Sequence, residues 1–259
     1  MTFYSRKRFG QHFLHDRNVI GRIVAALAPR PEEHIVEIGP GRGALTRELA
    51  KQLAHFDAVE LDRDLLAYLP SVIPPDKLTL HNADALKYDF CQLRQEGRKL
   101  RLVGNLPYNI STPLLFHLLD QSDCIEDMLF MLQKEVVQRL AATPGGKDYG
   151  RLSVMIQYRC RVEKLFDVAP GAFTPPPKVD SAMVRLVPLA TPPVTVNDTA
   201  QFAKVVRMAF ASRRKTLRNN LKGLLSAEQL LALGIDPVRR AETLTLAEFA
   251  TLSNAVVSS

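Results

Sequence analysis

The sequence has no apolar run near the ~20 residues that cross a membrane, so we expect no membrane-spanning segment. Its three cysteines, Cys91, Cys124 and Cys160, are far apart and in no CxxC pattern. This spacing predicts neither a disulfide framework nor a thiolate zinc site, and it favours a reducing cytoplasm. The segment MTFYSRKRFGQ is basic but is not followed by an apolar stretch, so we expect no secretory signal.

Acidic residues are also too few to balance the basic ones. The 259 residues include 34 Lys and Arg against 27 Asp and Glu, which gives a net charge of +7. Such an excess favours association with a polyanion, because the summed surface charge governs encounter with charged partners. The length of 259 residues suits one large domain or a domain plus a small appendage, and the hydrophobic content of 46% is ample for a full-sized core.

No internal repeat or low-complexity tract is evident, but a short apolar run is repeatedly followed by a helical pattern. The runs are HIVEIG (34–39), FDAVEL (56–61), KLTLHNAD (77–84), LRLVGNLPY (100–108) and DMLFML (127–132). This alternation predicts βα units around a parallel sheet with right-handed crossovers. Residues 151–168 and 180–189 are predicted as two longer strands that close the sheet edge.

The pattern changes after a proline-containing stretch at residues 188–198. Beyond it, Phe202, Val205, Val206, Ala209 and Phe210 form one apolar helical stripe. Ser226 with Gln229, and Thr245 with Glu248, have the spacing of capping boxes. We therefore predict an α/β domain over residues 1–190 and a small helical domain over residues 191–259.

Polar residues gather where the predicted strands end, which is where open α/β sheets bind ligands. Glu37, Gly39 and Gly41 lie at the end of the first strand and in the turn after it, and Glu60 lies at the end of the second. Glu60 is placed to accept hydrogen bonds from a ribose diol. Asp84, followed by Ala85, could accept from an adenine amine.

Three readings of this glycine-rich turn remain open. It can be a tight strand-to-helix connection, a dinucleotide site or a site for S-adenosylmethionine. The order G-P-G-R-G-A departs from the dinucleotide pattern G-x-G-x-x-G. A carboxylate at Glu37 would repel a pyrophosphate but favour an ammonium or sulfonium group, so S-adenosylmethionine is the favoured ligand.

The turn GNLPYN at residues 104–109 carries more chemistry than a connector needs. The side-chain oxygen of Asn105 and the carbonyl of Leu106 could hold the two hydrogens of an adenine amine. Pro107 would fix the backbone direction, and Tyr108 offers a face on which a flipped base can stack. The turn is interpreted as a clamp that presents the amine nitrogen to a methyl donor.

Several motifs together resemble the small-subunit (16S) ribosomal RNA adenine dimethyltransferase family. They are RKRFGQ-x-FL, EIGPGRG, GNLPYNISTP, FMLQKEV, YGRLSV, F-x-PPPKVDS and RRKTLRNNL, and they span nearly the whole chain. The resemblance implies a Rossmann-like class I S-adenosylmethionine-dependent methyltransferase sheet with a small all-helical C-terminal domain. It also implies N6,N6-dimethylation of two adjacent adenosines in the 3′-terminal hairpin of 16S rRNA during ribosome biogenesis, by a cytoplasmic monomer.

The same resemblance implies roles for individual residues. It places His12, Leu14, Gly39, Glu60, Asp84 and Asn105 at the cofactor, and Phe173 as a second aromatic wall against the target base. His12 departs from the family, whose usual residue here is Asn; a neutral imidazole can still offer one donor or acceptor. His12 and His15 could suggest a metal, but without further ligands no metal site is expected.

A run of basic side chains in the C-terminal part lacks any acid between residues 201 and 222. A solvated face usually mixes both signs, so this run predicts phosphate contacts, to which the N-terminal basic residues would add. The predicted RNA-binding residues are Arg6, Lys7, Arg8, Lys204, Arg207, Arg213, Arg214, Lys215, Arg218 and Lys222.

Three alternatives stay in view. A resistance-type methyltransferase acting on large-subunit RNA is the nearest relative of the favoured activity. A non-catalytic ribosome-assembly factor could keep the fold, although the intact residues 105–108 argue for chemistry. An NAD-dependent oxidoreductase is disfavoured by the glycine spacing.

Overall fold

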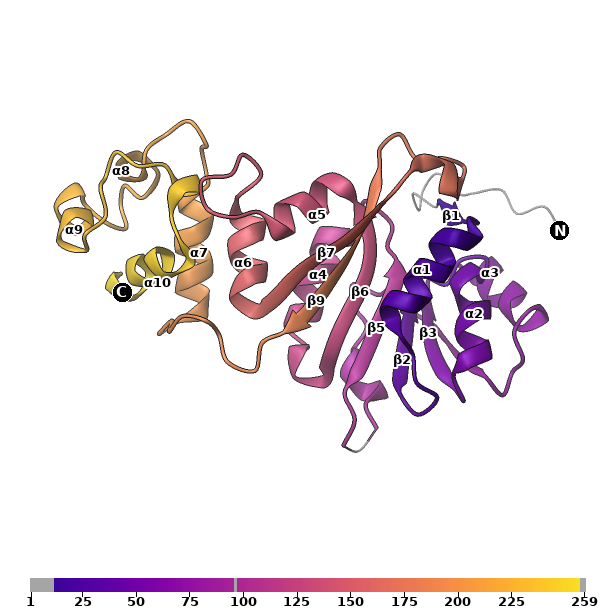
Figure 1. The fold of residues 1–259 in the computed structure, drawn as a ribbon. Coiled ribbons are helices and arrows are strands. Elements are labelled where there is room, and N and C mark those ends of the chain that lie inside the picture. The colour runs from indigo at the N-terminus through magenta and orange to yellow at the C-terminus, as the bar shows by residue number, and fades with distance from the viewer. Residues whose placement is uncertain (1–11, 96, 257–259) are drawn as a thin grey trace. The chain divides into compact units, whose positions relative to one another are not determined.

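The structure is a computed structural model, and it describes residues 12–95 and 97–256. The chain forms two compact units (Figure 1). The first unit holds the described residues up to Val137 together with Glu163–Pro188. The second holds Gln138–Val162 and the described residues from Leu189 onward.

A seven-stranded sheet with the order β4-β3-β2-β5-β6-β9-β7 forms the centre of the first unit. The first five strands in this order pair in parallel, and β9 runs antiparallel to β6. The predicted parallel sheet is therefore confirmed, as is the closing strand at 180–189. The strands are β2 (His34–Ile38), β3 (Phe56–Glu60), β4 (Leu78–Asn82), β5 (Leu100–Asn105), β6 (Ile125–Gln133), β7 (Cys160–Val168) and β9 (Ser181–Pro188).

Helices connect these strands, as the alternating pattern predicts. They are α1 (Arg17–Leu27), α2 (Ala44–Gln52), α3 (Arg63–Tyr68), α4 (Ser111–Leu119) and α5 (Lys134–Ala141), with short 3-10 turns η2 (Leu69–Ser71), η3 (Phe90–Leu93), η4 (Ser122–Cys124) and η5 (Pro170–Ala172). Two short strands, β1 (Phe13–Leu14) and β8 (Phe173–Thr174), pair with each other in antiparallel orientation. This pair joins the segment before α1 to the segment before β9.

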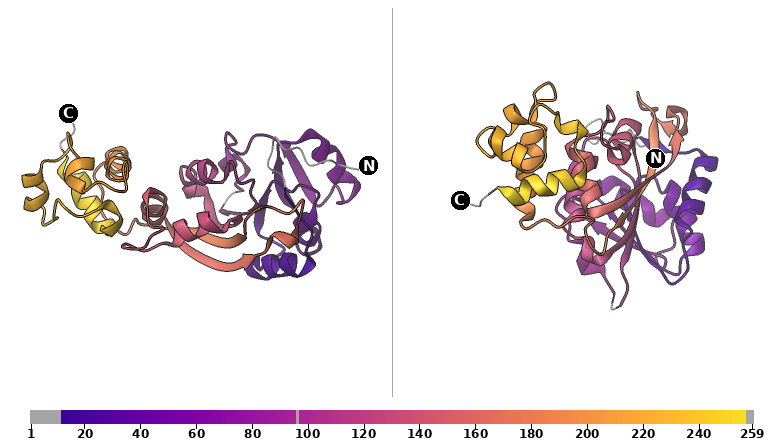
Figure 2. Two further views of the ribbon diagram at one scale, coloured as in Figure 1. Left: turned by 90° about the horizontal axis from the view of Figure 1, so that it is seen from above. Right: turned by 60° about the vertical axis from the view of Figure 1, so that its left-hand side comes forward.

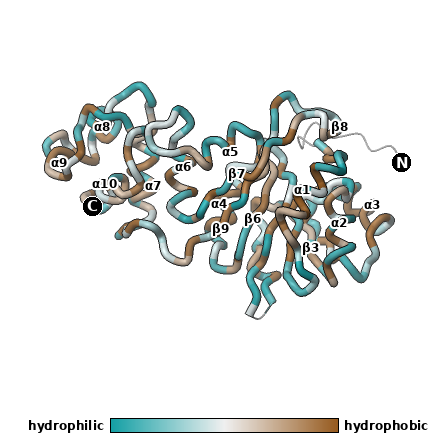
Figure 3. The backbone as a smooth tube through the Cα atoms, in the orientation of Figure 1, coloured by the Kyte–Doolittle hydropathy of each residue, from teal (hydrophilic) through white to brown (hydrophobic). Residues whose placement is uncertain are grey.

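One part of the core of the first unit lies between the sheet and helices α1 and α2. Ile23 and Leu27 of α1 and Leu49 of α2 are buried with Phe56 and Val103 of the sheet. Strand β6, in the middle of the sheet, is correspondingly apolar over most of its length (Figure 3). Figure 2 shows helices on both sides of the sheet, as expected for parallel strands whose two faces are both buried.

The prediction of a continuous strand over residues 151–168 is wrong in its first half. Residues Arg151–Arg159 form helix α6, and the strand begins only at Cys160. Val154 and Tyr158, four residues apart, are both buried in the core of the second unit. The Tyr158 ring lies 4.8 Å from that of Phe202, centroid to centroid. This packing selects the helix over an alternating strand pattern.

The second unit is helical apart from its short part of β7. Its other helices are α7 (Thr199–Ala209), α8 (Leu217–Asn220), α9 (Ala227–Ala232) and α10 (Leu246–Ala255), with the 3-10 turn η6 (Ala241–Thr243). Both predicted capping boxes are confirmed, at Ser226 and at Thr245. The sequence places the division near residue 190, whereas by packing Gln138–Val162 lies with the C-terminal helices.

The expectation of unpaired cysteines is wrong for two of the three. Cys91 of η3 and Cys124 of η4 form a disulfide, and their Cα atoms are 5.5 Å apart. The two residues are 33 positions apart, and only the packing of the two 3-10 turns brings them together. Cys160 is free and buried. Among the described residues, none of the helices has the length and apolar character needed to cross a bilayer.

Candidate active site

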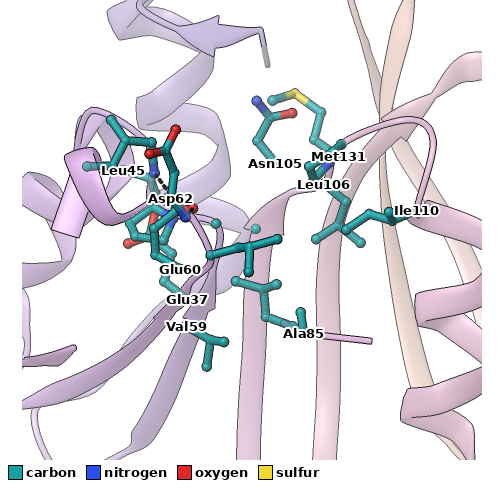
Figure 4. Close-up of a pocket in the computed structure, with 18 of the residues that line it drawn as sticks. Glu37, Leu45, Val59, Glu60, Asp62, Ala85, Asn105, Leu106, Ile110 and Met131 are labelled. Carbon is teal, nitrogen blue, oxygen red and sulfur yellow. Dashed lines mark hydrogen bonds between the residues drawn. The ribbon is translucent and has the colours of Figure 1, made fainter. Parts of the chain in front are cut away.

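A cavity of about 270 Å³ opens at the carboxyl ends of β2, β3 and β5. In Figure 4, Glu37, Glu60 and Asp62 lie on one side of it, and Asn105 and Leu106 lie on the other. Ala85, which follows β4, lies between the two sides. The cavity therefore occupies the edge of the sheet at which the sequence predicts a ligand.

The end of β2 brings a buried carboxyl to the cavity, and the turn that follows brings backbone groups. Gly41 has φ +57°, and a Cβ at this position would come 3.2 Å from the Phe13 ring. Only glycine adopts this conformation readily and leaves the space open. Glu37 is 2% exposed, and its Oε2 has no hydrogen-bond partner among the described residues. Burial, with a contribution from the nearby Glu60, raises the pKa of Glu37 to about 8.

The Glu60 carboxylate at the end of β3 is held by backbone groups. Asp62 N donates to its Oε1 at 2.9 Å, and Gly41 N donates to its Oε2 at 3.3 Å. Burial raises the pKa of Glu60, and these backbone hydrogen bonds oppose the rise. Each oxygen keeps a lone pair, so a fixed carboxylate that can accept further hydrogen bonds lines the cavity.

The segment after β4 contributes a second acceptor. Leu86 N donates to Asp84 Oδ1 at 3.0 Å, which orients the carboxylate and leaves Oδ2 for another donor. The neighbouring Ala85 is buried and lines the cavity with Leu86. A planar group with an amine edge fits between such an acceptor and these apolar side chains.

The turn after β5 is positioned by a close contact between strands. A Cβ at Gly104 would lie 2.4 Å from Ile38 O, so only glycine lets β5 approach β2 here. Leu106 N donates to Met131 O at 3.1 Å, which ties the turn to β6. Asn105 Nδ2 donates to His12 O at 2.9 Å. The Asn105 side-chain oxygen therefore remains an acceptor at the cavity.

His12 and Tyr108 lie next to this acceptor. The two rings are 5.5 Å apart between centroids and are inclined by 32°. His12 Nδ1 is 2.7 Å from Pro175 O, and this contact requires a proton on Nδ1. The Tyr108 hydroxyl is 2.7 Å from Ser181 Oγ. Burial raises the pKa of Tyr108, with the Ser181 hydrogen bond opposing it, so the ring carries a neutral hydroxyl.

The structure brings together all of the residues predicted for cofactor binding, and also the turn from Asn105 to Tyr108. His12, Leu14, Glu37, Gly39, Gly41, Glu60, Asp84, Ala85, Asn105, Leu106, Pro107 and Tyr108 all line the one cavity.

Phe173 is not among these lining residues. Its side chain is 2% exposed and packs in the hydrophobic core, where β8 pairs with β1. This packing does not support its predicted role as a second wall against the base.

The predicted RNA-binding residues fall into two groups. Arg6, Lys7 and Arg8 lie outside the described residues. The seven C-terminal residues are all exposed: Lys204, Arg207, Arg213, Arg214, Lys215, Arg218 and Lys222. Among these, Arg213 donates to Tyr149 O at 3.2 Å. Within residues 12–95 and 97–256, no group of three or more His, Cys, Asp or Glu is arranged to hold a metal.

Several lining residues were missed by the sequence reading. Leu61 is 49% exposed although it lies between Glu60 and Asp62, and it offers an apolar contact at the cavity. In the sequence, a leucine between two acids at a strand end could have indicated this. Met131 of β6 and Met183 of β9 also line the cavity. Their periodicity matches that of ordinary core residues, so the sequence carries no signal for them.

Comparisons with a family model and with known proteins point to the same family. The family described as "Ribosomal RNA adenine dimethylase" matches residues 2–257. Proteins named "Ribosomal RNA small subunit methyltransferase A" are 59% identical in Pseudomonas aeruginosa and in Nitrosococcus oceani. Each match covers 96% of this chain. It covers 94% of the Pseudomonas aeruginosa protein and 95% of the Nitrosococcus oceani protein.

Two solved structures share the fold. A dimethyladenosine transferase from Plasmodium falciparum has a TM-score of 0.76 at 24% identity, over 93% of this chain and 96% of that one. The 23S rRNA methyltransferase ErmE has a TM-score of 0.72 at 26% identity, over 94% and 99%. The sheet is therefore that of the Rossmann-like class I S-adenosylmethionine-dependent methyltransferases, as predicted. The C-terminal part of the chain that follows the sheet is helical, also as predicted.

Proposed function

Since the chain belongs to the ribosomal RNA adenine dimethylase family, we propose that it methylates adenine in 16S rRNA. The reaction is the transfer of methyl groups from S-adenosylmethionine to N6 of two adjacent adenosines in the 3′-terminal hairpin. The observation that carries this proposal is the orientation of Asn105. Its Nδ2 is occupied by His12 O, so its oxygen is left to accept from the adenine amine.

Several residues that line the cavity support S-adenosylmethionine as its ligand. Glu60 is fixed by Gly41 and Asp62 and can accept from the ribose hydroxyls. Asp84 keeps one carboxylate oxygen for the adenine amine. The unpartnered Oε2 of Glu37 can accept a hydrogen bond from the ammonium group of the amino-acid end, and this positive charge would favour loss of the Glu37 proton. His12, Leu14, Gly39, Gly41, Ala85 and Asn105 complete the set.

The turn from Asn105 to Tyr108 acts on the target base. When bound, the cofactor supplies a methyl group on a positively charged sulfur. The Asn105 side-chain oxygen and the Leu106 carbonyl accept the two amine hydrogens and so direct the nitrogen lone pair. They also stabilise the positive charge that develops on that nitrogen. Pro107 fixes the carbonyl direction, and Tyr108 offers its ring face to the extruded base.

Phosphate contacts would come from the basic residues. We propose that residues 191–259 carry the RNA-binding function through Lys204, Arg207, Arg213, Arg214, Lys215, Arg218 and Lys222, with Arg6, Lys7 and Arg8 adding to it. Residues 1–190 would then form the catalytic domain. The exposure of the seven C-terminal side chains supports this assignment.

We further infer that the protein acts in the cytoplasm as a monomer on the small subunit or its precursor. The monomer is the oligomeric state that the family resemblance implies. Mass measurement in solution tests this directly. A dimer mass at working concentration would contradict it.

The proposed activity is tested with labelled S-adenosylmethionine and small ribosomal subunits that lack the modification. We expect label in two adjacent adenosines of the 3′-terminal hairpin, mapped by nuclease digestion and mass spectrometry. A second candidate is methylation of large-subunit RNA, because ErmE, a 23S rRNA methyltransferase, shares the fold at 26% identity. Label in 23S rRNA and none in 16S rRNA would favour that candidate.

A further inference from the structure

Tyr108 is held at its backbone and at the tip of its ring. Ser111 Oγ donates to Tyr108 O at 3.1 Å, which fixes the turn. At the other end, the Tyr108 hydroxyl and Ser181 Oγ share a hydrogen bond of 2.7 Å, in which either hydroxyl can donate. The two residues are 73 positions apart, so the contact depends on the fold.

Ser181 is a fixed partner because it belongs to the sheet. It is the first residue of β9, pairs with Gln133 of β6 and is fully buried. Lys134 N donates to Asp180 O at 2.9 Å next to it. Lys134 Nζ also lies 2.9 Å from Asp167 Oδ2 and 3.6 Å from Asp180 Oδ2. Both backbone and side-chain contacts therefore hold the start of β9 in place.

The direction of the Ser181 side chain follows from strand geometry. Residues two apart on a strand share a face, and Met183, two residues on, lines the cavity. Ser181 thus faces the same side as a cavity residue and reaches Tyr108 there.

The two contacts of the Tyr108 ring restrain different motions. The hydroxyl lies on the axis from Cβ through the ring, so the bond to Ser181 fixes the direction of that axis. The His12 ring, inclined by 32° at 5.5 Å, restricts rotation about the axis. Together they fix the position and the plane of a ring that is otherwise only half-buried.

We infer that Ser181 is a positioning residue for methyl transfer, which holds the Tyr108 ring where the target adenine stacks. This inference rests on the proposed function, because it assigns Ser181 a role through Tyr108. Correct placement of a bound base within a fraction of an ångström governs the rate of such a reaction. Ser181 does not line the cavity, so its effect is expected on turnover and not on cofactor binding.

A double-mutant cycle tests the inference, with Ser181→Ala, Tyr108→Phe and the combined variant. Turnover is measured with labelled S-adenosylmethionine on unmethylated small subunits. We expect Ser181→Ala to lower kcat roughly tenfold, the size expected for one hydrogen bond, with KM for S-adenosylmethionine changed by less than about twofold. The combined variant should be no slower than Tyr108→Phe alone, because both remove the same bond.

Ser153→Ala is the matched control. Ser153 is also fully buried, and its Oγ donates to a backbone carbonyl, that of Arg139, in the second unit. The Ser153→Ala variant should lose about as much stability as Ser181→Ala, but its kcat should equal that of wild type. If Ser181→Ala does not fold, Tyr108→Phe still tests the inference. It removes the same hydrogen bond, so the inference requires its kcat to fall.

An unchanged kcat in Ser181→Ala or Tyr108→Phe would overturn the inference. It would also be overturned if the fold-loss of kcat in the combined variant equalled the product of the losses in the two single variants. A wild-type protein that transfers no methyl group to 16S rRNA would instead contradict the proposed function.

Discussion

At the scale of single residues, folding takes the Glu37 carboxyl out of water. Its pKa is raised to about 8 by burial, whereas an exposed glutamate ionises near 4.3. The folded state therefore holds a proton that the unfolded chain releases between these values. The stability that this proton contributes is fully present below about pH 4.3 and is lost as pH rises through 8.

Glu37→Gln should remove this dependence on pH. Because glutamine does not ionise, we expect the variant to gain stability relative to wild type as pH rises from 5 to 8. The slope would be at most about 1.4 kcal/mol per pH unit. Urea unfolding of the cofactor-free protein at pH 5, 6.5 and 8 measures it. If the free energies of unfolding of wild type and Glu37→Gln changed equally with pH, Glu37 would be ionised in the folded state.

Glu60→Ala should weaken cofactor binding. Loss of hydrogen bonds from a ribose to a charged acceptor costs about 1.5–3 kcal/mol, or roughly 10- to 150-fold in Kd. S-adenosylmethionine and S-adenosylhomocysteine should lose affinity alike, because both carry the ribose. Calorimetry measures both, with Glu48→Ala on the exposed face of α2 as the control. Affinities equal to those of wild type would remove Glu60 from the ribose site.

At this scale, sequence reasoning locates a residue at the cavity where that residue lies at or near the carboxyl end of a parallel strand. Glu60 and Asp84 could be predicted because parallel strands all end at one edge of the sheet. Ser181 and Met183 could not, because they come from the antiparallel strand β9. Which of its residues meets Tyr108 depends on the register with β6, which the sequence does not display.

At the scale of elements, the close approach of β5 to β2 positions the turn from Asn105 to Tyr108. Gly104→Ala would place a Cβ 2.4 Å from Ile38 O, so the two strands would have to separate. We expect a loss of about 1–3 kcal/mol of stability together with slower methyl transfer.

Gly21→Ala is the matched control for this substitution. Gly21 lies in α1 with nothing within 4 Å of the added Cβ. Alanine there should stabilise the protein by about 0.5–1 kcal/mol, because glycine is unfavourable within a helix. Thermal unfolding and turnover of both variants are compared. Equal behaviour of the two would mean that the strand contact does not set the geometry of the turn.

The element that sequence reasoning missed is α6. The run RLSVMIQY is short and apolar, and such a run fits a strand and a helix equally well by periodicity. The choice is made by partners far along the chain, since Tyr158 packs on Phe202 of α7. Where a run bordered a glycine-rich or polar turn, as in β2 and β5, the strand was predicted correctly.

At the scale of the whole molecule, the excess of positive charge has a defined use in the proposed function. Reversing charge at Arg213 and Arg214 should weaken RNA binding and reduce the slope of log K against log salt by about 1 to 2. The matched control reverses Arg94 and Lys99, exposed residues of the first unit, and makes the same change in net charge. A slope equally reduced in both variants would indicate net charge and not local phosphate contacts.

The two-part organisation was predictable, but its exact composition was not. The proline-containing stretch and the change to purely helical periodicity indicate a C-terminal unit. Residues 138–162 join it through the burial of Tyr149, Val154 and Tyr158 among the C-terminal helices. Such long-range packing of an inserted segment leaves no local pattern. The Cys91–Cys124 pair was missed for the same reason.

The central claim is that Asn105 presents the adenine nitrogen to the methyl donor. Single-turnover methyl transfer by Asn105→Ala tests it most directly, with RNA and cofactor affinities measured on the same preparation. We predict that the rate falls by roughly 100-fold or more, while RNA affinity stays close to that of wild type. A rate equal to that of wild type would contradict the account.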